Sequence, residues 1–581
     1  MARQNEALND KGTLGRVKGW FEAAVNSKAY TSWRAEAKTS WDFYDGTQWT
    51  GEEVQRLTEN GQPAIVINKI APKIDNLAGS EVAGRTRIVY RSRSGMADEE
   101  VAARVLTDLA LYVAERSEQA LEISNVFRAG LVGRIGWLDI GVEDTAEGVE
   151  VFARAEDEFS VVWDPLSRRS DVSDARFVAR ERWLSLEEAK ALFAEKAGAL
   201  KSLQSDVHGP RGSVPYALAY GARGDEVGYY DPQREVYRVV EVQYRESAKQ
   251  WRIRLPDGRL VATFDKSRLR IKGAVVEEMV YVPRVRVAYF SGDILLDDRA
   301  LAYEHNSFTL VPFVYKRQRA DGRPYGLVRA AIDPQRELNK RRSKAMHLLN
   351  TAQVIADVDA VDDPNVLVKE AARPDGVILK RAGKDLRILR NTDMAVSQVQ
   401  VMEQAGRDIQ DVIGVFDEAI GKQSNATSGV AIQQRQVASS MNQMFAFDTL
   451  RLLKKNLGMQ VMALVRQFFT QEMVIQITDN LGAGRVIKLN EPVRDATGKQ
   501  VKGADGRPLV MPDLSAGQFD VVVEEVRDVA SARELEASQL EMLVRAGIPV
   551  PPDVLVEASG VAGKERILAA LQTPITVNQK G

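Results

Sequence analysis

The hydrophobic and polar positions between residues 331 and 471 predict two helices, a small excursion between them and one very long helix. The first helix begins at Asp333, whose carboxylate can accept from free backbone N–H groups and is followed by a helix-compatible proline. The second helix, at 393–416, carries one continuous apolar stripe. Two short strand-like runs between the helices, 354–358 and 376–379, predict a small α/β lobe at the far end of the pair.

Nine residues without a large apolar side chain, 421–429, follow the second helix, so we expect an exposed and mobile segment there. The helical period then continues from 429 to 471. At a rise of about 1.5 Å per residue this helix is roughly 60 Å long, which is more than a compact domain needs. Gly458 is a candidate position for a kink.

The rest of the chain has mixed helix and strand patterns, which together predict the α+β fold class. Residues 1–30 are polar with few apolar anchors. This composition is equally compatible with a surface segment and with a disordered tail. Helices are expected at 32–44, 70–81 and 97–122, and in two or three short pieces at 531–571. Strands are expected at 61–69, 136–142, 149–154, 236–244, 251–255, 275–281, 284–290, 473–477, 485–489 and 519–525.

Five aromatic residues lie close together near the first of these helices. They are Trp33, Trp41, Phe43, Tyr44 and Trp49. Such a concentration favours a local core over a platform on which a ligand stacks.

Length and composition limit the classes of protein that the chain can belong to. Its 581 residues exceed the size of one hydrophobic core, so we expect two or more lobes. The absence of cysteine excludes disulfides and cysteine-ligated metals, and three widely separated histidines disfavour a histidine metal centre. A net charge of −2 means that any nucleic-acid contact is local or weak. No apolar run is long enough for a membrane span or a signal peptide, so we expect a reducing, cytoplasm-like compartment.

Enzyme motifs are nearly absent from the sequence. The strings at 560–565 and 130–136 lack the spacing of a phosphate loop and of a dinucleotide fingerprint. Four acidic residues could bind a divalent cation, but their spacing misses the calcium-loop pattern, so a solvated acidic rim is favoured. These residues are Asp357, Asp359, Asp362 and Asp363.

A basic run covers much of the first helix of the pair. It consists of Arg336, Lys340, Arg341, Arg342 and Lys344. A solvated face is one interpretation. A face that pairs with acidic groups of a neighbouring subunit, or with phosphates, is the other, and the sequence leaves both open.

Short strings spread over most of the chain resemble, in the same order, those of the portal proteins of short-tailed bacteriophages. They are Phe43-Tyr44-Asp45-Gly46 with Gln48-Trp49, Gly61-Gln62-Pro63 with Asn68 and Gly79, Trp163-Asp164-Pro165, Tyr325-Gly326, Asp333-Pro334-Gln335-Arg336-Glu337-Leu338-Asn339, and Ser428-Gly429-Val430-Ala431-Ile432 with Gln434. Chance agreement at one motif does not explain so distributed a similarity.

The resemblance implies a portal fold with named parts. The parts are an N-terminal surface segment (1–30), a mixed α/β wing (31–330), two stem helices (331–352 and 391–416) bearing a small α/β clip (353–390), a channel loop (417–429), a long kinked helix (430–471), a β-rich return to the wing (472–530) and a helical C-terminal crown (531–581). No long heptad-bearing helix follows Leu571, so the extended C-terminal barrel of some members is expected to be missing.

The resemblance also implies a function. A dodecameric ring would occupy one capsid vertex as the conduit for genome packaging and ejection, without enzymatic activity or a cofactor. Its expected partners are further copies of the chain, the major capsid protein, the scaffolding protein, the terminase large subunit, tail adaptor proteins and non-specifically bound double-stranded DNA, with no membrane. The protein would assemble in the host cytoplasm and remain in the virion.

Three groups of residues are then candidate sites. The channel loop would touch DNA through Lys422, Gln423, Ser424, Asn425 and Thr427; the basic stem face would comprise Arg336, Lys340, Arg341 and Lys344; the clip would dock the terminase and adaptors through Asp362, Asp363, Asn365, Lys369 and Asp375. Two alternatives remain, another head-to-tail structural component and a nucleic-acid-processing packaging enzyme.

Overall fold

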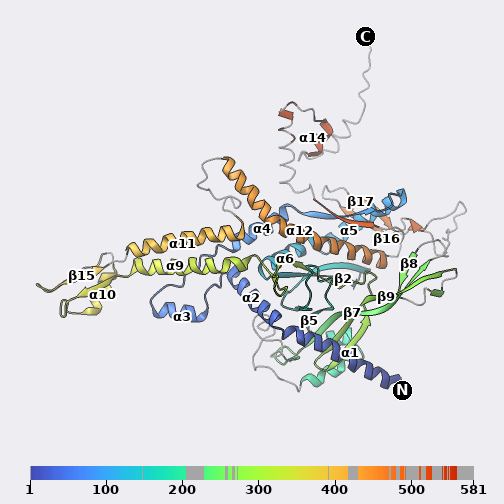
Figure 1. Ribbon diagram of the computed structural model, residues 1–581, viewed down its shortest axis with the longest axis horizontal. Coiled ribbons are helices and arrows are strands. Elements are labelled where there is room, and N and C mark those ends of the chain that lie inside the picture. The colour runs from blue at the N-terminus through green and yellow to red at the C-terminus, as the bar shows by residue number, and fades with distance from the viewer. Residues whose placement is uncertain are drawn as a thin grey trace, which may run out of the picture.

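The computed structural model shows a mixed body of helices and sheets from which a two-helix arm projects (Figure 1). It describes residues 2–146, 148–204, 228–254, 260–264, 269–270, 273–373, 375–389, 392–415 and 429–469, together with shorter segments between 473 and 558. The α+β class predicted from the sequence agrees with this architecture.

The N-terminal residues form two helices, α1 (Ala2–Val25) and α2 (Lys28–Asp45), of which α2 ends at Gly46 with φ 92°. The expectation of few apolar anchors is wrong for the second half of α1. Val17 and Phe21 are buried in the core of the body, and Trp20 stacks on Phe177 with ring centroids 5.9 Å apart. The helical spacing of these anchors places them on one face, and that face packs against a sheet.

Three further helices build the centre of the body: α4 (Ala71–Ala83), α5 (Ala97–Arg116) and α6 (Gln119–Val132). The single helix expected at 97–122 is wrong, because the chain breaks at Glu118, which has φ 47°. Helix α6 buries apolar side chains around much of its circumference, so the sequence gives it little periodic signal.

The first sheet is antiparallel with the order β11-β2-β3, formed by β2 (Ile135–Thr145), β3 (Gly148–Glu156) and β11 (Leu310–Val314). The pairing of β2 with β3 confirms the strands predicted at 136–142 and 149–154. Helix α6 packs against this sheet. The strand expected at 61–69 is absent from the structure.

The second sheet has the order β10-β9-β7-β5-β4 and is also antiparallel, with two short strands added on β7. Four separate strands were expected between 236 and 290, but they merge into two long ones, because their ladder continues through Ser247 and Pro283. The strands are β4 (Val161–Trp163), β5 (Phe177–Ser185), β6 (Tyr230–Asp231), β7 (Val236–Arg254), β8 (Leu260–Thr263), β9 (Val275–Ser291) and β10 (Ile294–Ala300). The short elements α7 (Leu186–Leu192), η1 (Ala197–Gln204), β12 (Lys316–Arg317), β13 (Pro324–Tyr325) and η3 (Val328–Ala331) complete the body up to the arm.

Strands from near the C-terminus complete the body, and one of them pairs with a strand from the N-terminal part of the chain. Strand β1 (Thr86–Ser92) pairs antiparallel with β20 (Phe519–Glu525), which confirms the strand expected at 519–525. The hairpin of β16 (Met473–Thr478) and β17 (Gly484–Leu489) is confirmed as well. Besides α12 and the arm, the remaining described elements are α3 (Gly51–Glu59), β18 (Glu491–Pro492), β19 (Val510–Met511) and α14 (Pro552–Ala558). Most of the tail for which short helices were expected lies outside the described residues.

The long helix α12 (Gly429–Phe468) has 40 residues and packs its C-terminal half against the body. Gly458 lies where this helix meets the sheet of β1 and β20. A Cβ atom there would lie 2.6 Å from Val521 Cγ1 and 2.8 Å from Ile88 Cγ2, so only glycine permits this approach. Close packing therefore accounts for Gly458, and a kink at this position stays a prediction.

Glu158 is a buried carboxyl group of the body, with 6% of its surface exposed, and it accepts a hydrogen bond from Trp41 Nε1 at 2.5 Å. Burial, with the neighbouring Asp157 carboxylate, raises the pKa of Glu158 to about 7. The folded state thus binds this proton more tightly than the unfolded chain does. The buried carboxyl group therefore lowers the free energy of unfolding. This destabilisation grows as the pH rises from about 4.5 to about 7 and stays constant above that range.

The variant Glu158→Gln is therefore expected to be more stable than the wild type at pH 8, by about 1–3 kcal/mol, with the difference vanishing near pH 4.5. The amide oxygen can still accept from Trp41. Urea unfolding at both pH values measures the effect, with the exposed Glu195→Gln as the matched control. A difference that is independent of pH would contradict the assignment.

Candidate functional site

The arm consists of α9 (Ile332–Asn350) and α11 (Thr392–Ile413), which pack against each other along the projection seen in Figure 1. Both helices were predicted. Leu338 lies in the buried interface together with Ala405 and Ile409. Helix α11 ends before the predicted 416, because Gly414 has φ 73° and turns the chain.

Three polar side chains of α9, spaced four residues apart, bind an extended segment of the body at the base of the arm. Gln335, Asn339 and Ser343 are each at most 1% exposed. Their side-chain oxygens accept from the backbone N–H groups of Lys69 at 3.0 Å, Ile67 at 3.1 Å and Ile65 at 3.2 Å, respectively. This polar ladder of α9 supplies residues 65–69 with the acceptors that a neighbouring strand would otherwise supply, and this segment belongs to no sheet.

The ladder also predicts the effect of an apolar substitution. Asn339→Leu removes the acceptor for Ile67 N–H and the donor to Gln48 Oε1 at 2.6 Å, which leaves buried polar groups unpaired. We expect a loss of about 2–3 kcal/mol in unfolding free energy. Urea unfolding checks this, with Lys340→Ala as the neighbouring exposed control, for which we expect less than about 1 kcal/mol. Equal effects of the two variants would refute the role of the ladder.

The tip of the arm is a small α/β unit made of β14 (Gln353–Ala356), α10 (Pro364–Ala372) and β15 (Leu386–Leu389). The predicted lobe is present, but the strand expected at 376–379 is wrong, because β14 pairs with β15 instead. Sequence reasoning also missed α10. Its signal is local: Asp363 Oδ1 accepts from Asn365 N at 2.8 Å and a proline opens the helix.

The polar residues proposed for the tip have local structural roles. Asp362 pairs with Arg381 at 2.6 Å, Asp375 pairs with Arg373 at 3.3 Å, and Asp363 caps α10. Lys369 is exposed and has no acidic partner in the part of the chain that the structure describes. Among those residues no group of three side chains is arranged to hold a metal ion.

Large apolar side chains are exposed over much of the tip, and the sequence analysis did not identify them as a site. Val358 is 82% exposed and Leu379 is 85% exposed. The others are Ile355, Val366, Val368, Val377, Ile388 and Leu389, each at least 39% exposed. Several exposed apolar side chains on one small lobe are typical of a protein–protein interaction site. The tip, with its exposed apolar side chains, is the candidate docking site.

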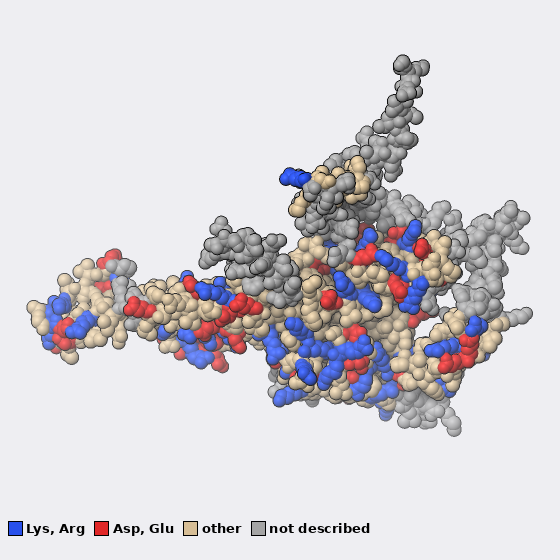
Figure 2. All heavy atoms as spheres, turned by 45° about the horizontal axis from the view of Figure 1, so that its top comes forward, with Lys and Arg blue, Asp and Glu red and all other residues tan. Residues whose placement is uncertain are grey.

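The basic face of α9 is largely paired within the chain. Arg341 binds Glu337 at 2.6 Å, Lys340 lies 3.6 Å from Glu53, and Arg336 lies over the Phe43 ring and 4.0 Å from Asp333. Lys344 has no acidic partner among the described residues. In the view of Figure 2, acidic and basic side chains are interspersed along the arm. Most of the predicted basic face is therefore neutralised locally.

The candidate channel residues Lys422, Gln423, Ser424, Asn425 and Thr427 lie outside the described residues. The structure describes the chain on both sides of them, up to Val415 at the end of the arm and from Gly429 at the start of α12.

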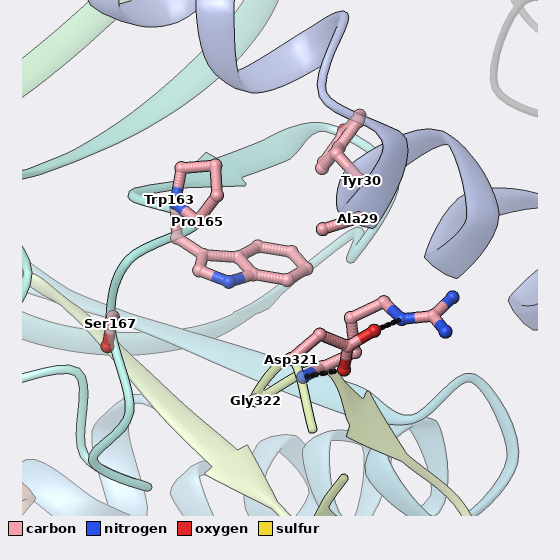
Figure 3. A pocket seen from close by; sticks show the side chains of 8 residues that line it. Ala29, Tyr30, Trp163, Pro165, Ser167, Asp321 and Gly322 are labelled. Atoms are coloured by element: carbon pink, nitrogen blue, oxygen red, sulfur yellow. Dashed lines mark hydrogen bonds and ion pairs between the residues drawn. The ribbon is translucent and has the colours of Figure 1, made fainter. Parts of the chain in front are cut away.

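The aromatic residues at and after α2 contribute to the core, as predicted, but not to one local cluster: Trp33 and Phe43 are buried in two different clusters, and Trp49 is only half-buried. Trp33 is fully buried and contacts Trp163 edge to face at a centroid distance of 4.9 Å. The pocket beside it, between Tyr30, Trp163 and the turn at Gly322, is drawn in Figure 3. Its cavity of about 10 Å³ is close to the volume of one water molecule and leaves no room for a stacked ligand.

The sequence is similar to those of known phage proteins. A family model for phage P22-like portal proteins matches residues 18–580. A portal protein of Acyrthosiphon pisum secondary endosymbiont phage 1 is 21% identical over 574 residues, covering 91% of this chain and 74% of that protein. A portal protein of Helicobacter pylori bacteriophage KHP30 is 25% identical over 185 residues, covering 31% of each chain.

A match over nearly the whole chain defines a structural protein of the bacteriophage virion. The chain belongs to the phage P22-like portal protein family. Its function is accordingly that of a phage portal, which serves DNA packaging into the capsid and DNA ejection from it. This confirms the resemblance found in the sequence. Within the described residues, no helix combines the length and apolar character that a membrane span requires.

Proposed function

We propose that twelve copies of the chain form the portal ring, with α9 and α11 as the stem, residues 353–390 as the clip and residues 31–330 as the wing. The exposed apolar surface of the tip is the observation that carries this proposal. A lobe that leaves Val358 and Leu379 in water has a surface suited to a partner, and its position at the end of the arm keeps it accessible in an assembly.

The tip then serves as the docking site for the terminase large subunit during packaging and for tail adaptor proteins afterwards. The apolar surface supplies the contact area. The polar and charged side chains of the tip orient the partner, because charges at the rim of an interface affect specificity and association rate more than affinity. They are Asp362, Asp363, Asn365, Lys369 and Asp375. The wing contacts the major capsid protein and the scaffolding protein, and residues 531–581 form the crown inside the head.

The channel assignment concerns the loop at 417–429. The local pairing of Arg336, Lys340 and Arg341 leaves few cations to hold DNA, which suits a conduit through which DNA must slide. In this proposal Lys422 and the neighbouring Gln423, Ser424, Asn425 and Thr427 contact passing DNA without reading its bases.

Lys422→Ala is expected to leave ring formation unchanged and to lower the retention of packaged DNA. The substitution removes one phosphate contact per subunit, so the salt dependence of DNA retention should become shallower. Nuclease-protected DNA per head, measured at two ionic strengths, tests this expectation, and Lys369→Ala is a control outside the loop. Rings that fail to form with Lys422→Ala would show that the segment is structural.

A further inference from the structure

A cavity of about 120 Å³ opens at the surface of the body, where segments far apart in the sequence meet. Its wall is formed by the end of α4, the start of β1, one face of α5, the first turn of α6, and α12. Its apolar lining includes Ile88, Ala114 and Ile123. A cavity of about 150 Å³ holds one benzene molecule, so this smaller space accommodates an apolar body of fewer than about six heavy atoms.

The polar side of the cavity carries an excess of positive charge. Arg85, Arg87 and Lys454 line it together with a single carboxylate, Glu81. Both oxygens of that carboxylate are engaged, one by Ser124 Oγ at 2.6 Å and the other by Lys454 Nζ at 3.2 Å. One carboxylate of the lining therefore faces three cations, of which Arg87 also lies 3.9 Å from Glu524.

Two of the cationic groups have capacity for a further acceptor. Arg85 Nε is buried and has no hydrogen-bond partner among the described residues. Lys454 is 4% exposed and donates to Glu81 and to Thr86 Oγ1 at 3.0 Å, which uses two of its three N–H bonds. Burial lowers the pKa of Lys454 even though Glu81 raises it, so the charge of this ammonium is incompletely compensated.

Helix α6 adds a third contribution, because its first two residues, Gln119 and Ala120, line the same cavity. No side chain caps this helix. The N-terminus of a 14-residue helix presents backbone N–H groups and a partial positive charge. It reinforces the attraction for an anion that the arginines and the lysine already create.

We propose that this cavity binds a small organic anion: a carboxylate held by Arg85 and Lys454, on an apolar body that fills the space beside Ala114 and Ile123. Such a ligand would bridge α12 to α4, α5 and α6. It would thereby stabilise the attachment of the long helix to the body by mass action.

Calorimetric titration of the purified full-length chain with butyrate tests the proposal. We expect saturable binding with one site per chain and a rise in the unfolding temperature. Butylamine, which has a similar apolar body and the opposite charge, and inorganic phosphate, which has no apolar body, should bind at least about tenfold more weakly. Equal binding of either compound would overturn the proposed ligand class, and so would the absence of saturation up to about 10 mM butyrate.

Three variants localise the site. Arg85→Ala should weaken butyrate binding about tenfold or more, because a charge-assisted hydrogen bond is lost. Arg93→Ala is the matched control, since its side chain pairs with Asp520 on the surface and should leave binding unchanged. Ala114→Leu should fill the cavity and abolish binding while the chain still folds. Unaltered binding in Arg85→Ala or Ala114→Leu would place the ligand elsewhere and refute the assignment.

Discussion

Replacing residues 353–390 by a short glycine-serine linker is expected to yield heads without packaged DNA, although the body and the arm still fold. The tip makes its own sheet from β14 and β15, and Ala360, Leu367 and Ala371 form its small buried centre. Its removal therefore exposes little of the remaining chain. Nuclease-protected DNA per head measures the effect. Normal packaging by the shortened chain would show that the tip is not the motor's docking site.

A finer variant separates docking from folding. Val358→Asp combined with Leu379→Asp places charges on two side chains that are more than 80% exposed, so chain stability should change by no more than about 0.5 kcal/mol per site. Binding of the terminase large subunit should weaken about 30-fold to 1,000-fold, as for loss of an interface hot spot. Leu166→Asp, at a 66% exposed leucine of the body, is the control and should have no effect on binding.

Arg180→Leu is expected to have the largest effect on stability, a loss of about 3–5 kcal/mol in unfolding free energy. Arg180, on β5, bonds to Asp139 on β2, Glu156 on β3 at 2.9 Å and Glu241 on β7 at 2.9 Å. Although burial opposes its charge, these three carboxylates raise the pKa of the guanidinium. The variant leaves a cluster of carboxylates between the two sheets without its central cation.

Arg182→Leu is the matched control for this prediction. Arg182 lies two positions along the same strand, is 46% exposed and approaches Asp139 only to 3.7 Å, so we expect less than about 1 kcal/mol. Denaturant unfolding of both variants gives the comparison. If Arg180→Leu unfolds at the wild-type midpoint, the buried network does not hold the sheets together.

The helices of the arm could be predicted from the sequence because their signals are local. Asp333 marks the start of α9 and an apolar stripe marks α11, and both elements lie within a few residues of their predicted ends. The fold class and the family could be predicted for a related reason. Local helix and strand patterns indicate the fold class, and short strings distributed along the chain indicate the family. The tip lobe also follows from alternating apolar and turn residues, although the identity of its second strand does not.

The elements that the sequence misplaced depend on distant partners. Residues 61–69 have a strand-like pattern, but their backbone binds Gln335 and Asn339 more than 260 positions away. Strand β1 was missed because it is completed by β20, where Arg91 pairs with Glu524 at a separation of 433 residues. No pattern within a window of neighbouring residues contains such pairings.

The lobe at the tip was predicted in position, whereas its use as a docking site stays a proposal. The polar residues chosen at the tip, such as Asp362 and Asp363, serve local pairing and capping. The apolar side chains that the structure exposes were interpreted only as parts of strand-like runs or were not singled out. A lobe as small as residues 353–390 cannot bury all of its valines and leucines. Its length alone therefore indicates that some of them are exposed.

End-on electron microscopy of the purified chain tests the central claim most directly. The account predicts closed rings of twelve subunits around a central opening wide enough for a DNA duplex, with the tips gathered at one end. Particles that stay monomeric at every concentration, or that assemble into open filaments without a channel, would contradict it.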